Sequence, residues 1–248
     1  LLTSTNPGAG TWSVAAVGGR RTIGSLACPS TSLCIGADGE TDLLISSNPA
    51  ADGSSWRVFR PPGHDYLASL SCGSPTSCVA VDGGFADRYF SSSRPTGGRH
   101  AWRVTSVRDP IKFDPGSTEV VDQVACSSRT VCLALVSDSG PPGAAAAVGT
   151  VYAFDPVPRP HGFHRLRVHG RFLQGVLELS CLAVPHQCAA GDPRGAVVSS
   201  SPGSGRSWHR ARSGRNLFSR SCPSARLCVA LHVDPLSPVT STAPGSQE

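Results

Sequence analysis

The chain has 248 residues, of which 39% are hydrophobic and 16% are charged, and its formal net charge is +5. The low charged fraction excludes a disordered polyelectrolyte, and no apolar run approaches the roughly 18–20 residues needed to cross a bilayer. The chain also holds 27 glycines and 21 prolines, which predicts a turn-rich all-β protein. Its modest positive charge gives only weak attraction to anionic surfaces in general.

Five repeat units follow one another along the chain, each marked by two close cysteines. Zinc sites usually space their thiols as C-x2-C to C-x4-C, whereas these pairs have five or six residues between them. We therefore predict five local disulfides, no metal site and an oxidising compartment. The pairs are Cys28/Cys34, Cys72/Cys78, Cys126/Cys132, Cys181/Cys188 and Cys222/Cys228.

Each unit is predicted to hold four short strands. The first carries a bulky aromatic residue, and the second runs into the first cysteine. The third is the apolar run after the second cysteine, such as CVAV at 78–81, and the fourth is a segment such as LLISS at 43–47. This period predicts a β-propeller of about five four-stranded blades with one local disulfide per blade. The aromatics, which we expect to pack between blades, are Trp12, Trp56, Trp102, Phe163 and Trp208.

One domain is predicted over residues 1–248. The opening LLTSTNPG and the closing PVTSTAPGSQE both match the fourth-strand segment LLISSNPA, so six fourth strands accompany five of the others. The chain has no methionine and no signal peptide, and we expect it to be a segment of a longer exported protein. The repeat units span approximately 10–48, 54–93, 100–155, 161–201 and 206–242.

A turn rich in Ser, Thr, Pro and Gly precedes the aromatic in several units, as in STNPGAGTW at 4–12 and SSSPGSGRSW at 199–208. These segments resemble the Ser/Thr-x-Asp-x-Gly-x-Thr-Trp box of Asp-box (BNR) propellers, the superfamily that contains sialidases and photosystem-assembly-type propellers. Asn6 and Asn48 stand where that box has Asp, and insertions stretch its spacing. With their cysteine pairs, the units also resemble secreted repeat proteins of high-GC bacteria. The resemblance implies the fold over nearly the whole chain and leaves the activity open. The nearest matches are Ser4–Trp12, Ser47–Trp56 and Ser200–Trp208.

An aspartate follows every cysteine pair. A ring of such carboxylates could bind a cation. The Asp-Gly steps at 38–39 and 82–83 are also strong signals for type I′ hairpin turns, so we interpret the aspartates as turn residues. They are Asp38, Asp82, Asp138, Asp192 and Asp234.

Two irregular inserts, 105–122 and 137–149, interrupt the repeat. Extra loops on one propeller face often determine specificity, so these inserts are candidate binding elements or else tolerated surface insertions. The basic stretches 161–172 and 206–220 are either a patch for an acidic polymer or solvated outer strands. The candidate binding residues are Asp109, Lys112, Asp114, Glu119 and Asp122.

Sialidase-like hydrolysis needs an arginine cluster, a Tyr–Glu pair and an acidic general acid/base. Phe59-Arg60-Pro61-Pro62 is superficially similar to a sialidase motif, and Tyr66 and Glu178 could meet at the propeller mouth. Arginines recur after the repeat aromatics, however, and a repeated position is a poor catalytic candidate. The sequence favours a monomeric, secreted or cell-surface binding or scaffold module for a glycan, cell-wall polymer or protein, with no cofactor and no specific nucleic acid. The alternative is a carbohydrate-active hydrolase or lyase.

Overall fold

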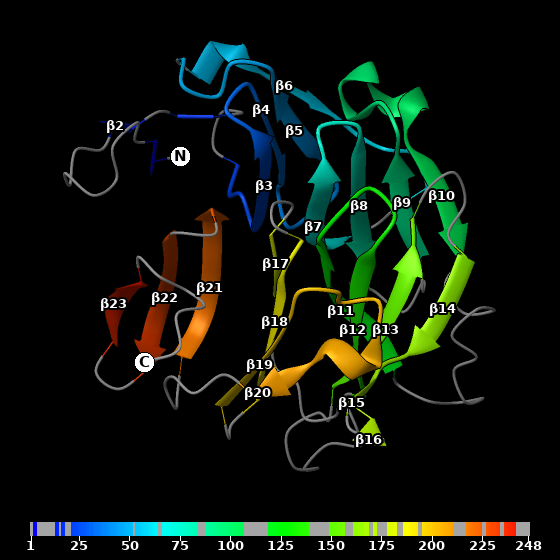
Figure 1. The fold of residues 1–248 in the computed structure, drawn as a ribbon. Helices are drawn as coiled ribbons and strands as arrows, with labels where there is room; N and C mark the ends of the chain where they lie inside the picture. The colour runs from blue at the N-terminus through cyan, green and yellow to red at the C-terminus, as the bar shows by residue number, and fades with distance from the viewer. Residues whose placement is uncertain are drawn as a thin grey trace.

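The chain folds into antiparallel sheets that stand side by side around a common centre (Figure 1). No helix in the described part of the chain is long and apolar enough to span a membrane. The computed structural model describes residues 2–3, 13–14, 16–17, 21–51, 53–63, 66–83, 88–106, 119–138, 149–156, 161–168, 171–172, 178–182, 186–192, 195–210, 217–224, 227–233 and 236–241.

In the part of the chain that the structure describes, four sheets contain four strands each, and we call them blades 1 to 4. Blade 1 consists of β3 (Ser25–Ser30), β4 (Leu33–Ala37), β5 (Leu43–Ser46) and β6 (Trp56–Phe59). Blade 2 consists of β7 (Leu67–Ser74), β8 (Ser77–Asp82), β9 (Arg88–Ser92) and β10 (Arg103–Ser106). Blade 3 consists of β11 (Glu119–Cys126), β12 (Cys132–Asp138), β13 (Thr150–Asp155) and β14 (His161–Arg165). Blade 4 consists of β17 (Glu178–Cys181), β18 (Cys188–Asp192), β19 (Gly195–Ser199) and β20 (His209–Arg210).

Smaller sheets flank these blades. The pair β1 (Leu2–Thr3) and β2 (Ser13–Val14) matches Leu2 with Val14, as β5 and β6 match Leu44 with Val58, so the predicted likeness of the two segments extends to their register. Where a fifth four-stranded blade is predicted, the described residues form three strands, β21 (Leu217–Ser224), β22 (Leu227–Val233) and β23 (Leu236–Ser241). The remaining elements are the hairpin β15 (Arg167–Val168) and β16 (Arg171–Phe172) and the 3-10 turns η2 (Gly53–Ser55), η3 (Pro95–Gly97), η4 (Arg99–Ala101) and η5 (Gly205–Ser207).

The aromatic strand closes each blade instead of opening it, which differs from the strand order predicted within a unit. Trp56 lies opposite Ser46 in the β5–β6 pair, because the turn at 47–55 folds β6 back onto β5. The segment that follows β6 crosses to the next blade, where the N–H of Leu67 donates to the carbonyl of Glu40. Each blade therefore starts at its first cysteine strand and ends at its aromatic strand.

The first strands of successive blades are neighbours, with β7 between β3 and β11 and β11 between β7 and β17. These inner strands lie toward the middle of Figure 1, and β6, β10 and β14 lie toward its periphery. The cysteine hairpins and the aromatic hairpins lie at one end of every blade, which we call the cysteine end. The turn at 38–42, the end of β8 at Asp82 and the starts of β7, β11 and β17 lie at the other end, which we call the aspartate end.

The core consists of apolar layers between adjacent blades. Trp102 of blade 2 is in a cluster with Ile35 and Leu43 of blade 1. Trp208 of blade 4 is in a cluster with Leu133 of blade 3. Both tryptophans thus face the preceding blade, where a buried aromatic side chain stabilises by about 2–3 kcal/mol. Trp56 packs in the same way against Val17, which follows β2.

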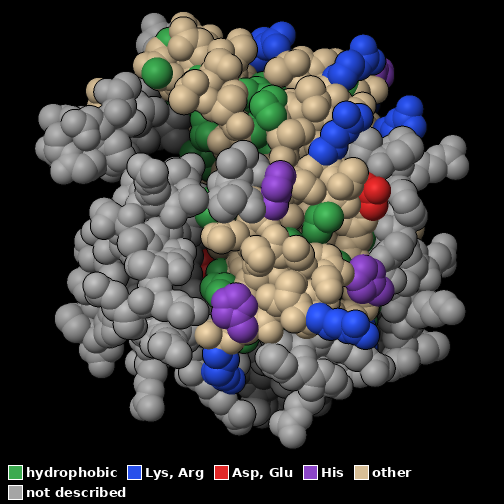
Figure 2. Space-filling model, viewed as in Figure 1, with side chains coloured by type: hydrophobic (Ala, Val, Ile, Leu, Met, Phe, Trp, Pro, Cys, Tyr) green, Lys and Arg blue, Asp and Glu red, His purple; other side chains and the backbone are tan. Residues whose placement is uncertain are grey.

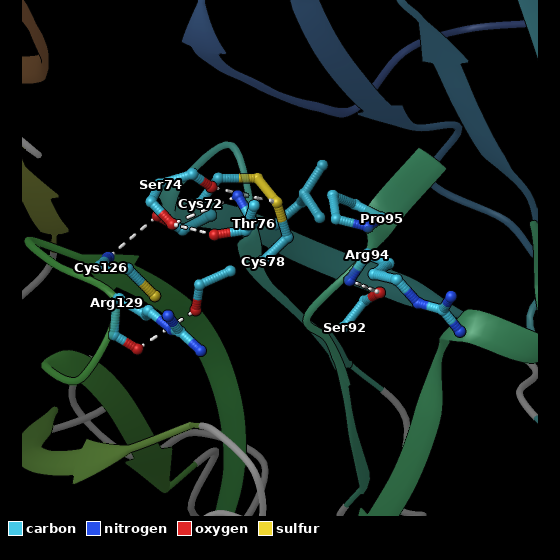
Figure 3. Close-up of a disulfide and its surroundings, with 12 residues drawn as sticks. Cys72, Ser74, Thr76, Cys78, Ser92, Arg94, Pro95, Cys126 and Arg129 are labelled. Atoms are coloured by element: carbon cyan, nitrogen blue, oxygen red, sulfur yellow. Dashed lines mark hydrogen bonds between the residues drawn. A yellow bond between two sulfur atoms is a disulfide. The ribbon is translucent and has the colours of Figure 1, made fainter. Parts of the chain in front are cut away.

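Four of the predicted disulfides are formed, and they indicate an oxidising environment. Each closes the hairpin between the first two strands of its blade, and in blade 2 Cys72 and Cys78 lie directly opposite each other in the ladder (Figure 3). The side chains of the fifth pair, Cys222 and Cys228, lie outside the described residues, although their strands pair. The bonded pairs are Cys28–Cys34, Cys72–Cys78, Cys126–Cys132 and Cys181–Cys188.

Replacing Cys72 and Cys78 together by alanine should lower the free energy of unfolding by at least about 2 kcal/mol. The reason is that the disulfide restricts the unfolded chain, and without it the unfolded chain regains conformational entropy. Cys78 is fully buried between blades 1 and 2, so the change also leaves a small cavity. The matched control is the same double substitution at Cys28 and Cys34, where Cys28 is exposed and less packing is lost. Urea unfolding of the two variants measures the difference, and equal losses would contradict the packing contribution.

Candidate functional site

A serine at the end of the third strand organises the aromatic hairpin at the cysteine end. In blade 2, Ser92 Oγ accepts the backbone N–H of Arg94 at 3.1 Å and donates to the carbonyl of Ala101 at 2.8 Å. The hydroxyls of Ser46 and Ser199 accept the equivalent N–H in blades 1 and 4. The short polar side chain therefore fixes the turn that presents Arg94 and its neighbours.

A second repeat position joins the inner strands of adjacent blades. In each case the acceptor is a side-chain oxygen of the residue three positions before the first cysteine of one blade. The donor is the backbone N–H of the residue two positions before the first cysteine of the next blade. The inner-strand polar residues at this position are thus occupied by blade-to-blade contacts, which indicates structural use. The pairs are Ser25 with Leu70 (3.0 Å), Ser69 with Val124 (3.1 Å) and Gln123 with Leu179 (2.7 Å).

The turn of blade 1 at the aspartate end is held by an ion-pair network. Arg21 Nη1 lies 2.7 Å from Asp38 Oδ2 and 2.5 Å from Asp42 Oδ2, and Arg60 Nε lies 3.2 Å from Asp42 Oδ1. Asp38 Oδ1 also accepts the backbone N–H groups of Glu40 and Asp42, each at 2.9 Å. Both aspartates are buried, and their charges are compensated by the two arginines within the turn.

This turn differs from the type I′ turn that Asp38-Gly39 predicts. Residues 38–42 form a five-residue loop in which Gly39, with φ +74°, has the positive φ and Asp38 caps two N–H groups. In blade 2, Asp82 is buried at the end of β8 and Gly83 has no positive φ. The physical reason is that an Asp carboxylate can satisfy a wider loop by accepting backbone hydrogen bonds itself. Asp138 and Asp192 end β12 and β18, and Asp234 lies outside the described residues.

Acid should weaken this turn through Asp38. Burial alone would raise the pKa of Asp38, but the N–H groups of Asp42 and Glu40 and the guanidinium of Arg21 lower the pKa below its usual value of 3.8. A carboxyl with a lowered folded pKa contributes stability above pH about 4, and this is lost as pH falls through the folded value. Asp38→Asn should therefore lower the free energy of unfolding at pH 7 and flatten its dependence on pH below about 4.

Urea unfolding at a series of pH values measures both effects. The matched control is Glu40→Gln, because Glu40 is exposed and contributes its backbone to the same turn. It should keep the slope of the native protein. If the free energy of unfolding of Asp38→Asn depends on pH as steeply as that of the native protein, other carboxyl groups cause the loss of stability in acid.

The predicted binding residues fall at the aspartate end as far as the structure describes them. Asp122 is on β11 at a register shift between Val121 and Gln123, and its carboxylate accepts the hydroxyl of Ser137. Asp122 is exposed as a whole residue, but desolvation of its carboxyl group raises the pKa of Asp122. Glu119 pairs through its backbone with Asp138, so both inserts depart from neighbouring strand ends. Asp109, Lys112 and Asp114 lie outside the described residues.

The sialidase-like residues are only partly brought together. Arg60 donates to Asp42 and to Thr41 Oγ1, so its guanidinium is already used within blade 1. Tyr66 is exposed just before β7, and Glu178 begins β17, with β11 between these two inner strands. Both residues lie at the aspartate end, but the inner strand of blade 3, β11, separates the strands that carry them. Arg60 of the motif 59–62 therefore has a structural role in blade 1, where it binds Asp42 and Thr41.

Arginines gather at the opposite, cysteine end, which the sequence reasoning missed. The basic stretches at 161–172 and 206–220 include the last strands of blades 3 and 4, β14 and β20, and continue into the hairpin β15–β16 and into β21. In β14 the guanidinium of Arg165 is stacked over the ring of Tyr152, 5.5 Å from its centroid. The denser group surrounds the aromatic hairpins of blades 1 and 2 (Figure 2). The signal in the sequence was the arginine that directly follows a repeat tryptophan. This group, the arginine rim, consists of Arg57, Arg94, Arg99 and Arg103.

Comparison of the sequence with protein-family models and with curated proteins finds no match. Among solved structures, the chain is similar to U3-55K (TM-score 0.54, 14% identity, covering 92% of this chain and 64% of that one). It is also similar to the WD40 domain of Pan2 from Neurospora crassa (0.56, 9%, 91% and 64%) and to YCF48 from Cyanidioschyzon merolae (0.50, 12%, 97% and 87%). WD40 domains are β-propellers. The fold is a β-propeller.

The propeller spans about 64% of the length of the U3-55K and Pan2 structures. At these identities the similarity establishes the architecture, and a propeller architecture is compatible with many functions. The resemblance to Asp-box propellers stays a prediction. The function must therefore be argued from the residues of the two blade ends.

Proposed function

We propose that this propeller is a non-catalytic, extracytoplasmic binding or scaffold module for a glycan or protein partner. The observation that carries the proposal is the use of repeat-equivalent polar residues on the inner strands. Ser25, Ser69 and Gln123 each bridge to the next blade. An enzyme is expected instead to converge unlike, unpaired polar groups at the mouth.

The electrostatics of blade 1 support the same proposal. Asp38 and Asp42 are paired with Arg21 and Arg60, which leaves these carboxylates without a free role as acid or base. The four local disulfides support a location outside the cytoplasm, because such bonds persist in oxidising compartments.

A hydrolase is the second candidate, and Asp122 is the observation that favours it. Asp122 breaks the repeat, since Ala68 occupies the equivalent position four residues before the first cysteine of blade 2. Its carboxylate has a raised pKa and lies at the same blade end as Glu178. A raised carboxyl pKa is typical of a general acid, although buried structural carboxyls share this property.

A glycan array combined with turnover assays on sialosides and acidic and neutral polysaccharides tests the proposal. We expect retention of at least one ligand class with no product formed. Turnover that disappears in Asp122→Asn or Glu178→Gln, while Asp155→Asn at the other blade end remains active, would overturn the binding module in favour of the hydrolase.

A further inference from the structure

The exposed charge of this propeller is divided between its two ends. Among side chains that the structure describes, the exposed carboxylates are Glu40 and Asp122, both at the aspartate end. Asp155, which is half-buried, is the described carboxylate at the cysteine end. The exposed arginines are far more numerous, and most of them lie at or near the cysteine end. The exposed arginines at both ends are Arg21, Arg57, Arg60, Arg94, Arg99, Arg103, Arg129, Arg165, Arg206 and Arg210.

The arginine rim is the densest part of this basic end. Arg57 of blade 1 reaches the turn of blade 2, where its Nη2 lies 3.5 Å from the carbonyl of Thr96. In that same turn, Arg94 directly precedes η3 and Arg99 is the first residue of η4. The serine at position 92 fixes the backbone of Arg94, and Figure 3 shows the Arg94 side chain extending away from the disulfide. Three guanidinium groups thus come from one junction between two blades.

These guanidinium groups remain available to a ligand. In the described part of the chain, no carboxylate lies within ion-pair distance of Arg57, Arg94, Arg99 or Arg103. This contrasts with Arg21 and Arg60, whose charges are matched by Asp38 and Asp42. Figure 2 shows several basic side chains on this part of the surface and one acidic side chain below them.

The rim also repeats with the blades. Arg57 and Arg103 each follow a buried tryptophan and lie opposite equivalent residues, Ile45 and Ser91, in the neighbouring strand. Cations that recur at a fixed structural interval complement a polymer whose negative charges also recur. A guanidinium is well suited to this task because its planar donors form paired hydrogen bonds with a carboxylate.

We infer that the arginine rim, at the cysteine end of blades 1 and 2, binds an acidic polysaccharide through the carboxylates of its uronic acid residues. This inference rests on the proposed binding function and specifies the partner. A nucleic acid fits less well, because single strands are held largely by stacking on exposed aromatics. The tryptophans of this end are buried, and the one aromatic among the exposed large hydrophobic residues described, Tyr66, lies at the aspartate end.

Binding of the full chain to polygalacturonate tests the inference, with neutral dextran and single-stranded oligo-dT as comparison ligands. The variant Arg57→Ser/Arg94→Ser/Arg99→Ser should weaken polygalacturonate binding by about tenfold to a hundredfold. The matched control, Arg129→Ser/Arg206→Ser/Arg210→Ser, removes the same number of positive charges from blades 3 and 4. It should retain most of the affinity. A lysine version of the first variant should bind with intermediate affinity, because it keeps the charge and loses the paired geometry. Thermal unfolding establishes that all variants fold.

The possible results separate failure of the arginine rim as a polysaccharide site from failure of the proposed binding function. Equal losses in the two serine variants, or tighter binding to oligo-dT than to polygalacturonate, would overturn the rim as a polysaccharide site. Retention of a neutral glycan or a protein without any polygalacturonate binding would overturn this inference and leave the binding module intact. Turnover of a polysaccharide would overturn the binding module itself.

Discussion

Replacing Trp208 by alanine is expected to lower the free energy of unfolding by about 3–5 kcal/mol, the usual cost of emptying a buried aromatic site. The side chain is 1% exposed and fills the layer between blades 3 and 4 with Leu133 and Leu179. Its indole N–H donates to the carbonyl of Pro202 at 3.2 Å, so that hydrogen bond is lost as well. Urea unfolding followed by circular dichroism measures the change.

Phenylalanine substitutions separate the hydrogen bond from the packing. Trp102 donates to the carbonyl of Pro95 at 3.3 Å, whereas Trp56 Nε1 has no hydrogen-bond partner among the described residues. Both side chains are buried, at 2% and 6% exposure. Trp102→Phe should therefore cost about 1–3 kcal/mol more than Trp56→Phe, because it leaves a buried carbonyl unsatisfied. Equal costs would show that the indole hydrogen bond contributes nothing.

Gly73→Ala is expected to destabilise the propeller by about 3 kcal/mol or more, because the added methyl group has no room. Gly73 directly follows Cys72 in the cysteine hairpin of blade 2, and a Cβ there would lie 1.9 Å from the carbonyl oxygen of Ser128 in blade 3. The obstacle is backbone, so a side-chain rotation cannot relieve it. Blades 2 and 3 would have to separate at the cysteine end, which would also break the bond from Ser77 Oγ to the carbonyl of Arg129.

The control for this substitution is Gly203→Ala in the aromatic hairpin of blade 4. A Cβ at Gly203 would meet Val131 at an ordinary 3.7 Å, and the residue has no positive φ. Its stability should stay close to that of the native chain. Thermal unfolding of both variants decides the matter, and a tolerated Gly73→Ala would mean that the two blades can move apart without loss.

Four disulfide pairs and the buried positions of Trp56, Trp102 and Trp208 could be predicted from the sequence because both are set by local spacing, whereas Trp12 lies outside the described residues. Cys72 and Cys78 are six residues apart, and a two-residue turn between Ser74 and Ser77 is enough to bring them together. In blade 3, His164 pairs with Ala153 as Arg57 pairs with Ile45 in blade 1, which puts Phe163 on β14 at the strand position of Trp56. The side chain of Phe163 lies outside the described residues, so its packing between blades stays a prediction. Local hairpins leave a direct pattern in the sequence.

The candidate sites were harder to predict because they depend on residues 39 to 55 positions apart. Nothing in the local sequence indicates that Ser69 caps Val124 or that Arg57 reaches Thr96. The most basic stretches of the sequence are 161–172 and 206–220, although the arginines with no matching carboxylate described beside them surround a junction between blades 1 and 2. Charge counts along the chain cannot distinguish an arginine in an ion pair from one that is available.

The sequence by itself determined the all-β repeat, its local disulfides and the apolar residues that face neighbouring blades, since turns, hairpins and strand patterns act over a few residues. The tertiary structure decided which strand closes each blade, which polar residues join one blade to the next and how charge divides between the two ends. Those features follow from packing between blades, where the contacts involve residues distant in sequence and each blade end collects side chains from several units.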